Sequence, residues 1–327
     1  MRAGGSGNQA PRLIQYRCFR NTDPPGLTEI WNESVTNPGA FSLRSTTPLE
    51  MCVLSKPYFD PNGLVVAEED GRLIGFAHAG LGPNSAETDI SVEVGIICAL
   101  AVRPVYRRKK IGTELLRRSE LYLKRLGAKD LVAGGMRPLS PFYFGVYGGA
   151  DAPGFLASDP TAAPFFEQHG YQRWNTALVF DLPLENYQPP ADPRFLNLRR
   201  THDVQLVPHP EITSWWQECV LGQYEPVEFR LMDKLTGIPA ARTLVWEMSQ
   251  ARRPGFNAAG LLDVQVRPDL RRRGFARFLI SQMARYLQEN FFRSIEVHVP
   301  EVNQPAVNLI RGLGFEQVDV GRSFRKA

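Results

Sequence analysis

Hydrophobic and polar positions along the chain follow the same succession of patterns twice. Residues 63–81, GLVVAEEDGRLIGFAHAGL, form two apolar runs separated by Asp70-Gly71, a strong signal for a two-residue hairpin turn. Residues 229–248, FRLMDKLTGIPAARTLVWEM, repeat the pattern with a turn near Thr236-Gly237. Each stretch therefore predicts an antiparallel pair of strands.

Each predicted hairpin is followed by a strand, an amphipathic helix, another strand and a last helix. The first strand of this series ends at Val102 in one copy and at Val266 in the other. Apolar residues at the spacing of one buried helix face come next: Ile111, Leu115, Leu116, Leu123 and Leu126, or Phe275, Leu279, Ile280, Met283 and Leu287. The next strand is expected at 130–133 or 294–299, and the last helix ends before Gly170-Tyr171 or Gly314-Phe315. The repeated order predicts a duplicated α/β domain.

A basic turn joins the strand to the helix in both copies. The chain reads VRPVYRRKKIGTELL from Val102 and VRPDLRRRGFARFLI from Val266. This order places backbone N–H groups and cations at the mouth of a helix, where an anionic ligand can bind. Cations at a helix N-terminus are unfavourable without a bound anion, so the turns indicate a phosphate-bearing ligand.

A proline-rich stretch separates the two copies. Residues 182–194, LPLENYQPPADPR, contain four prolines and cannot form a regular element. The first copy is longer because of a Gly-rich and aromatic insertion. Such long loops are usually functional or disordered, and the density of aromatic residues argues against disorder. The predicted organisation is a flexible N-terminus (1–12), an N-terminal domain (13–182) with its insertion (136–159), a linker (183–194) and a C-terminal domain (195–327).

Composition narrows the class of protein. A chain of 327 residues has room for two domains, and a formal charge of +4 is too small to suggest a nucleic-acid binder. Its four cysteines are scattered without a CxxC pair, which argues against a zinc site or a disulfide framework and fits a reducing compartment. The sequence has no apolar run long enough for a membrane span and no signal-peptide core. We therefore expect a cytoplasmic protein with no metal and no membrane partner.

The turns and the closing segments resemble the GNAT superfamily of acetyl-CoA-dependent N-acyltransferases, twice over. The family signature R/Q-x-x-G-x-G/A is complete at 271–276, RRRGFA, whereas 107–112, RRKKIG, has Lys110 where the first glycine is usual. The closing pattern is present at Asn303, Ala306, Leu309, Ile310 and Gly314-Phe315, and more weakly at 159–171. The tandem arrangement is similar to that of mycothiol synthase.

The resemblance implies the fold and the co-substrate. Each half is expected to be a mixed, mostly antiparallel twisted sheet flanked by helices. Acetyl-CoA is expected as co-substrate, with its pyrophosphate on the turn amides and its thioester near the preceding strand. The implied binding residues are Leu100, Val102, Arg107, Arg108, Lys109, Lys110, Ile111, Gly112 and Thr113 in the first half, and Val264, Val266, Arg271, Arg272, Arg273, Gly274, Phe275, Ala276 and Asn303 in the second.

The family's usual catalytic base and acid are missing. Its base commonly stands at positions that here hold Cys98 and Ile96, or Leu262 and Gly260, and Phe166 and Ile310 replace its usual tyrosine acid. Asp263 lies one residue along and points to the opposite face unless a bulge re-aims it. The remaining catalytic candidates are Cys98, Glu93, Asp263, Tyr143 and Tyr147, each of which also has a purely structural interpretation as a core or loop-packing residue.

Two functions remain open at this stage. The favoured one is an N-acetyltransferase that acts on a small-molecule amine by direct transfer in a ternary complex, as a monomer or homodimer. The alternative is a non-catalytic acyl-CoA sensor or scaffold, suggested by the missing base and acid. Nucleic-acid binding is disfavoured because the arginine clusters lie on the cofactor turns. The sequence leaves open which half is catalytic.

Overall fold

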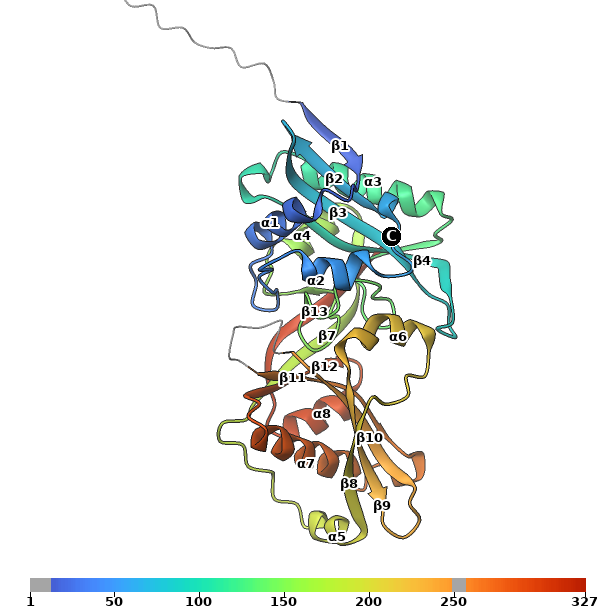
Figure 1. Ribbon diagram of the computed structural model, residues 1–327, viewed down its shortest axis with the longest axis vertical. Coiled ribbons are helices and arrows are strands. Elements are labelled where there is room, and N and C mark those ends of the chain that lie inside the picture. Colours follow the sequence, from blue (N-terminus) through green and yellow to red (C-terminus); the bar gives the residue numbers. More distant parts are fainter. Residues whose placement is uncertain (1–12, 249–256) are drawn as a thin grey trace, which may run out of the picture.

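One long sheet, to which both halves of the chain contribute, forms the centre of the molecule (Figure 1). The structure is a computed structural model that describes residues 13–248 and 257–327, so the predicted flexible N-terminus lies outside the described residues. The strands are β1 (Ile14–Cys18), β2 (Leu64–Glu69), β3 (Arg72–Pro83), β4 (Ile90–Val102), β5 (Asp130–Ala133), β6 (Phe155–Leu156), β7 (Tyr171–Pro183), β8 (His202–Pro208), β9 (Val227–Asp233), β10 (Pro239–Glu247), β11 (Ala258–Val266), β12 (Ser294–Pro300) and β13 (Glu316–Lys326).

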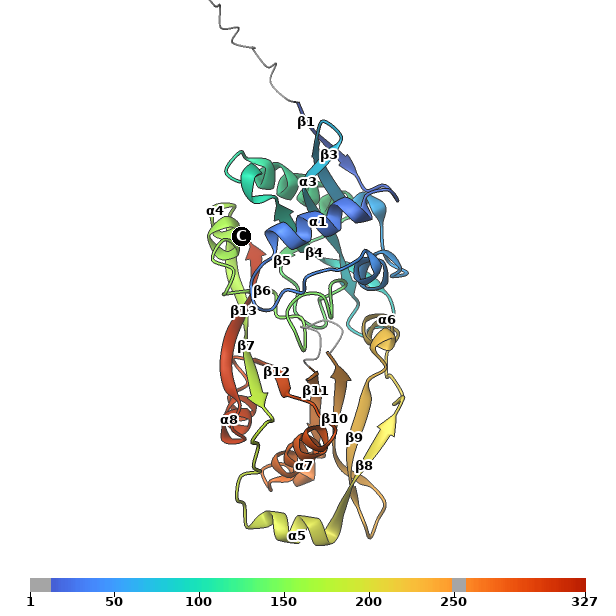
Figure 2. The ribbon, with the colours of Figure 1, turned by 60° about the vertical axis from the view of Figure 1, so that its left-hand side comes forward.

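Helices flank this sheet on both faces (Figure 2). They are α1 (Pro24–Ser34), α2 (Thr47–Leu49), α3 (Ile111–Arg125), α4 (Ala162–Gln168), α5 (Arg194–Thr201), α6 (Trp215–Leu221), α7 (Phe275–Glu289) and α8 (Gln304–Gly312). Shorter helical turns are η1 (Glu50–Leu54), η2 (Pro61–Gly63), η3 (Pro104–Tyr106), η4 (Gly222–Tyr224) and η5 (Pro268–Leu270). The long helices α3 and α7 confirm the two predicted amphipathic helices, although Leu126 lies beyond α3 and is 40% exposed.

The strand order shows that the two halves exchange their last strands. The order is β1-β2-β3-β4-β5-β13-β7-β12-β11-β10-β9-β8, and β6 pairs with β13. The last strand of the chain, β13, thus lies between two first-half strands, with Phe324 opposite Ala133 of β5. In turn β7 pairs with β12, with Val179 opposite His298. Figure 2 shows β7 and β13 running together from one half to the other.

The predicted fold class is confirmed: each half is a mixed, mostly antiparallel sheet with helices. The parallel pairs are β4–β5 and β11–β12. No helix or strand lies between Pro183, where β7 ends, and Arg194, where α5 begins. We retain 183–194 as a proposed linker, while the sheet itself crosses this boundary.

Alternating side chains along the strands pack in separate layers. Val65 of β2 packs in one core cluster with Leu115 of α3, whereas its neighbour Val66 packs on the opposite face with Ile30 of α1. The helix α4 lies on the α3 face, where Phe166 shares a cluster with α3 residues. In the second half, α7 and α8 pack on one face and α6 covers the other. This layering gives each half one face with a basic turn and an opposite face with α1 or α6.

The aromatic insertion is packed between the two halves. Phe142 and Tyr143 join the first-half cluster under α1, while Phe144 packs against Trp246 of β10 with ring centroids 5.1 Å apart. The side chains of Phe142, Tyr143 and Phe144 are all buried. The insertion therefore fills the space between the α1 face and the α6 face and contacts both.

Candidate active site

The basic turn of the first half presents cations at the start of α3. After η3, Arg108 and Lys110 take positive φ values of 65° and 62°. The Arg107 guanidinium turns back and donates its Nε–H to the Val102 carbonyl oxygen at 3.2 Å. Because the first four N–H groups of a helix have no partner within it, the turn combines amide donors and positive charge at one place.

The second-half turn follows the same backbone path. After η5, Arg272 and Gly274 take φ values of 64° and 91°. Arg271 donates its Nε–H to the Val266 carbonyl oxygen at 3.3 Å, as its counterpart does in the first half. The two anion-binding turns predicted from the repeat therefore have the same conformation.

In each half, the strand that leads to the turn continues beyond its last pair with the neighbouring parallel strand. β4 and β5 pair last at Ile97 and Ala133, and β11 and β12 pair last at Leu261 and Val297. Both β4 and β11 continue beyond these points as far as the turn. The resulting gap exposes one edge of a strand, whose peptide groups are available to an extended ligand.

Leu100 and Val102 direct their peptide groups into the first-half gap. The Arg103 N–H donates to the Ile74 carbonyl of β3 at 2.9 Å, and peptide groups alternate between the two sides of an antiparallel strand. Leu100 and Val102 therefore face away from β3. In the second half, Arg267 corresponds to Arg103, and its N–H donates to the Ala240 carbonyl of β10 at 3.0 Å. Val264 and Val266 correspond to Leu100 and Val102 and face the gap.

A cavity of about 450 Å³ lies between the first-half turn and α4. Its lining includes every predicted binding residue of this half except Lys109, whose ammonium lies 4.9 Å from the centre of the Tyr106 ring. Gly112 keeps the cavity open, since a Cβ atom there would lie 3.2 Å from the Phe165 ring. The other lining residues are Ser34, Val35, Ala101, Tyr106, Phe155, Asp159, Pro160, Thr161, Ala162, Pro164, Phe165, Phe166, Gln168 and His169. The volume suits a small-molecule ligand.

His169 closes the far side of this cavity and was missed by the sequence analysis. Its Nδ1–H donates to the Phe165 carbonyl at 2.7 Å, so the Thr113 hydroxyl donates to its Nε2 at 3.0 Å. This bond connects the first turn of α3 to the end of α4. Only the tertiary fold brings the two residues together, because they lie 56 positions apart.

The second-half turn has different neighbours. The guanidinium of Arg194 lies 3.1 Å from the position that a Cβ atom would take at Gly274, and its NH2 group bonds Asp192 at 2.6 Å. Phe275 is buried beneath the turn, with its ring 5.1 Å from that of His202. Asn303 caps α8 by accepting the Ala306 N–H at 3.3 Å. Arg273 and Ala276 flank Gly274 and Phe275 in the turn and the first residues of α7.

The first-half catalytic candidates do not form a reactive group. Glu93 lies at the exposed beginning of β4, 65% accessible, and bonds Lys129 at 2.6 Å. The Cys98 thiol donates to the Ile96 carbonyl at 3.4 Å, and burial raises its pKa far above the usual range. It borders a cavity of only about 30 Å³, so this side of β4 has space for about one water molecule.

Tyr143 and Tyr147 share the border of that small cavity but are also held in place. The Tyr143 hydroxyl lies 3.1 Å from His78 Nδ1, and its ring stacks on Trp31 with centroids 5.6 Å apart. The Tyr147 hydroxyl accepts the Leu156 N–H at 3.0 Å. Burial raises the pKa of both phenols above their usual range. Both tyrosines pack the insertion against the sheet.

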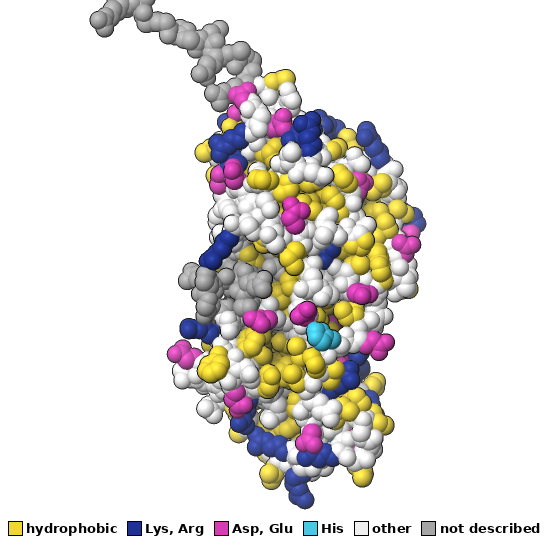
Figure 3. Space-filling model, viewed as in Figure 1, with side chains coloured by type: hydrophobic (Ala, Val, Ile, Leu, Met, Phe, Trp, Pro, Cys, Tyr) yellow, Lys and Arg dark blue, Asp and Glu magenta, His cyan; other side chains and the backbone are white. Residues whose placement is uncertain are grey.

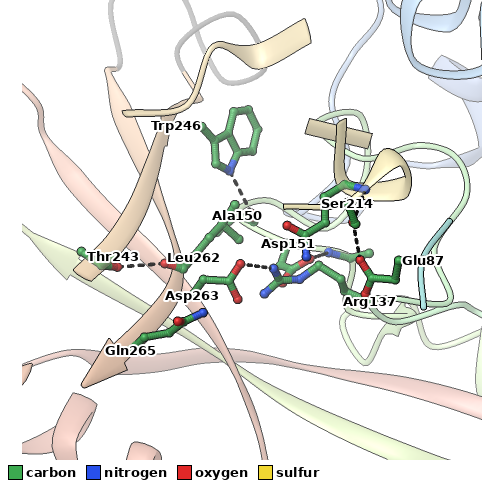
Figure 4. Close-up of polar contacts among 12 residues, drawn as sticks. Glu87, Arg137, Ala150, Asp151, Ser214, Thr243, Trp246, Leu262, Asp263 and Gln265 are labelled. Carbon is green, nitrogen blue, oxygen red and sulfur yellow. Dashed lines mark hydrogen bonds and ion pairs between the residues drawn. The ribbon is translucent and has the colours of Figure 1, made fainter. Parts of the chain in front are cut away.

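A bulge re-aims Asp263, as the sequence analysis had allowed. The register of β10 against β11 shifts between Arg242 and Leu244, and Asp263 takes a φ of 47°. Its Oδ2 accepts from Arg137 NH1 at 2.8 Å, while Arg137 Nε bonds Asp151 at 2.9 Å (Figure 4). Asp263 therefore faces the insertion of the first half, where Arg137 pairs with both Asp263 and Asp151.

Next to this ion-pair cluster, Glu296 and His298 lie on β12. Both lie within the strand that the sequence predicted at 294–299, but neither was among the predicted site residues. Glu296 Oε1 lies 3.1 Å from His298 Nε2 and accepts the Ala150 N–H of the insertion at 2.7 Å. Within the described residues, no three His, Cys, Asp or Glu side chains are grouped to hold a metal ion. No helix of that part of the chain is long and apolar enough to cross a membrane.

Comparisons with known protein families agree with the two turns. A family model described as the acetyltransferase (GNAT) family matches residues 27–138, which include β4, the first turn and α3. A second model, described as FR47-like protein, matches residues 252–323, which include the second turn. A search of curated protein sequences finds no match.

Solved structures share the fold at low sequence identity. A tandem GNAT protein from the clavulanic acid biosynthesis pathway has a TM-score of 0.67 at 17% identity, over 96% of this chain and 98% of that one. A GCN5-related N-acetyltransferase from Sphaerobacter thermophilus has a TM-score of 0.64 at 17% identity, over 96% and 95% of the two chains. A glucosamine N-acetyltransferase region of a fungal multi-domain GH3 β-N-acetylglucosaminidase has a TM-score of 0.68 at 16% identity. It matches 97% of this chain, which spans 38% of that longer one.

The repeated turn, the parting strands beside it and the family models on both halves lead to one assignment. The clavulanic acid pathway protein and the Sphaerobacter thermophilus protein each match almost the whole chain and not one half alone. The first half therefore contains an acetyltransferase (GNAT) family domain and the second half an FR47-like domain, and the whole chain has the fold of a tandem two-domain GNAT protein.

Proposed function

We propose that the protein is an N-acetyltransferase that transfers the acetyl group of acetyl-CoA directly to a small-molecule amine in a ternary complex. The observation that carries the proposal is the cavity of about 450 Å³ at the cationic first-half turn. An anionic nucleotide thioester fits its chemistry, because helix N–H groups and the side chains of Arg107, Arg108 and Lys110 meet there.

The residues present fit both ends of acetyl-CoA. The turn amides before α3 suit the pyrophosphate, and the edge of β4 at Leu100 and Val102 suits the extended arm that ends in the thioester. In the half that turns acetyl-CoA over, a backbone N–H in the corresponding gap polarises the thioester carbonyl. The amine nitrogen then attacks the carbonyl carbon, the carbon–sulfur bond breaks, and coenzyme A leaves as the thiol.

We further propose that the amine reacts in the second half. In the first half, the face of β4 opposite α3 is filled by Phe142, Tyr143 and their neighbours, and only about 30 Å³ remains beside Cys98. The second half has the complete turn sequence and polar groups on the corresponding face, among them Asp263 and Glu296. The first half would then bind acetyl-CoA without turning it over, as in the alternative of a sensor or scaffold.

The surface and the cysteines support a small-molecule enzyme of a reducing compartment. On the face shown in Figure 3, Lys and Arg side chains are interspersed with Asp and Glu and form no continuous basic stripe. Cys18, Cys52, Cys98 and Cys219 are all free thiols. We therefore propose a cytoplasmic monomer or homodimer with no nucleic-acid partner.

Titration calorimetry with acetyl-CoA and thiol release with an amine panel test the function. Spermidine, glucosamine and tyramine form a suitable panel, since they present primary amines on different scaffolds. We expect binding of acetyl-CoA and thiol release that requires one of the amines. Binding without thiol release for any primary amine favours the sensor, and absence of binding contradicts both functions.

A further inference from the structure

Glu296 and His298 lie on the face of β12 opposite α7, at the point where the second-half strands separate. Their neighbours Ile295, Val297 and Val299 are buried in the core cluster under α7, so alternation along the strand turns Glu296 and His298 to the other face. His298 directly follows Val297, the last residue of β12 that pairs with β11. The imidazole therefore stands at the gap in which the proposed function places the thioester.

The hydrogen bonds of this pair fix which nitrogen of the imidazole carries the lone pair. An ionised carboxylate only accepts, so the 3.1 Å contact from His298 Nε2 to Glu296 Oε1 requires the proton on Nε2. The Nδ1 atom then has the free lone pair, and it is buried without a hydrogen-bond partner among the described residues. The His298 side chain is only 4% exposed. A buried basic nitrogen with no partner is costly unless a ligand supplies one.

The first half contributes to this arrangement. The Ala150 N–H of the insertion donates to Glu296 Oε1 at 2.7 Å, and a Cβ atom at Gly149 would lie 1.8 Å from the same oxygen. The Ala150 carbonyl accepts from Trp246 Nε1 at 2.9 Å, which fixes the insertion to β10 (Figure 4). The carboxylate that orients His298 is thus held by a segment from the other half.

We propose that His298 is the proton acceptor of the acetyl transfer in the second half, and that Glu296 is the positioning residue that holds it. The inference rests on the proposed function. Nδ1 takes one proton from the substrate ammonium, and the neutral amine attacks the thioester carbon. The carbon–nitrogen bond forms, the carbon–sulfur bond breaks, the second nitrogen proton passes to the departing thiolate, and His298 releases its proton to solvent.

Acidic residues lie on several of the elements around the pair. On β7, Asp181 pairs in register with Glu296, and on β11 Asp263 lies beyond the last strand pair. Asp151 of the insertion and Asp263 of β11 both pair with Arg137 of the insertion.

The test compares three variants by thiol release with acetyl-CoA and whichever of spermidine, glucosamine and tyramine wild type turns over fastest. We expect His298→Gln to lower kcat by about 100-fold or more, since general bases contribute that much. The KM for acetyl-CoA should stay within about twofold, because the cofactor turn is untouched. The acidic limb of the wild-type pH–rate profile should be absent in His298→Gln. Glu296→Gln should lower kcat by a smaller factor, since the amide oxygen still accepts from Ala150.

His78→Gln is the matched control. His78 is also fully buried and also has one nitrogen, Nε2, without a partner among the described residues, but it lies on the filled face of the first half. We expect this variant to retain wild-type kcat within about twofold. Equal losses in His78→Gln and His298→Gln, or an unchanged kcat in His298→Gln, overturn the proposal.

Two further outcomes separate the proposal from the function on which it rests. If the wild-type protein binds acetyl-CoA but releases no thiol with any of the amines, the proposed acetyl transfer is wrong, and so is the role of His298. If circular dichroism shows that His298→Gln does not fold, Glu296→Gln decides. An unchanged kcat and an unchanged pH–rate profile in that folded variant overturn the proposed positioning.

Discussion

Lys110 and Gly274 hold the same left-handed backbone position, directly before α3 and α7, at φ values of 62° and 91°. A residue with a Cβ atom is strained there by about 1–2 kcal/mol, whereas glycine is not. The preceding Arg108 and Arg272 also match, at 65° and 64°. The first half thus keeps the turn conformation despite its lysine, because the direction of the N–H groups depends on the backbone and not on the side chain.

Exchange of the two residues should move stability in opposite directions. We expect Lys110→Gly to raise the free energy of unfolding by up to about 1 kcal/mol, since relief of strain exceeds the entropy that glycine adds to the unfolded chain. Gly274→Lys should lower it by a similar amount. Urea unfolding measures both. Lys109→Gly is the control, because Lys109 is not among the positive-φ residues of the described chain, and a gain in that variant would contradict the explanation.

Large side chains at the helix starts should remove acetyl-CoA binding one half at a time. A Cβ atom at Gly112 would already lie 3.2 Å from the Phe165 ring, so an indole in Gly112→Trp must fill the cavity. Gly112→Ala needs a shift of only a few tenths of an ångström and should still bind. Gly274→Trp should act in the same way on the second half. Calorimetric stoichiometry checks this, and unchanged stoichiometry in both tryptophan variants would show that the sites lie elsewhere.

Arg137 should stabilise the contact between the halves. It bonds Asp151 at 2.9 Å and Asp263 at 2.8 Å. The side chain of Asp263, which belongs to the second half, is only 29% exposed. Arg137→Met leaves two partly buried carboxylates without their cation, so we expect a loss of about 2–3 kcal/mol in the free energy of unfolding. Removal of the exposed pair between Arg173 and Glu167 should cost far less, which makes Arg173→Met the control for urea titrations.

Acid should destabilise the first half through His78. Burial lowers the pKa of His78 from 6.5 to about 3. The unfolded chain therefore gains a proton as the pH falls through 6.5, whereas the folded chain gains it only near 3. Within this window the free energy of unfolding falls by up to about 1.4 kcal/mol per pH unit. Urea midpoints of His78→Gln should decline less steeply than those of wild type between pH 6.5 and 4, and parallel curves would contradict this.

The exchanged strand β13 should stabilise the first half. Phe324 is fully buried in a core cluster with Phe166 of α4 and Leu116 of α3, although it lies three residues from the C-terminus of the chain. Phe324→Ala should lower the free energy of unfolding by about 3–5 kcal/mol and weaken acetyl-CoA binding in the first half. Hydrogen exchange should show faster opening of β5 and α4. Faster exchange confined to second-half strands would contradict the strand exchange.

The repeated elements were predictable from the sequence because they depend on local patterns. The 3.6-residue spacing of Leu115 and Leu279 with their neighbours was enough to predict α3 and α7, and Asp70-Gly71 joins β2 to β3 as expected. The turn motifs were predictable as well, since their order along the chain fixes where N–H groups and cations meet. Glu93 was misleading because strand position alone does not show that it pairs with Lys129 at the exposed end of β4.

The sequence by itself determined the duplication, the fold class of each half and the two basic turns, because each is written in consecutive residues. Only the tertiary structure decided that β7 and β13 change places, that the insertion fills the first-half acceptor face, and that Ala150 holds the carboxylate beside His298. These relationships join residues far apart in the sequence, and the bond between Arg325 of β13 and Asp130 of β5 spans 195 positions. No local pattern encodes such contacts, because they arise only when burial of the two halves against each other fixes their positions.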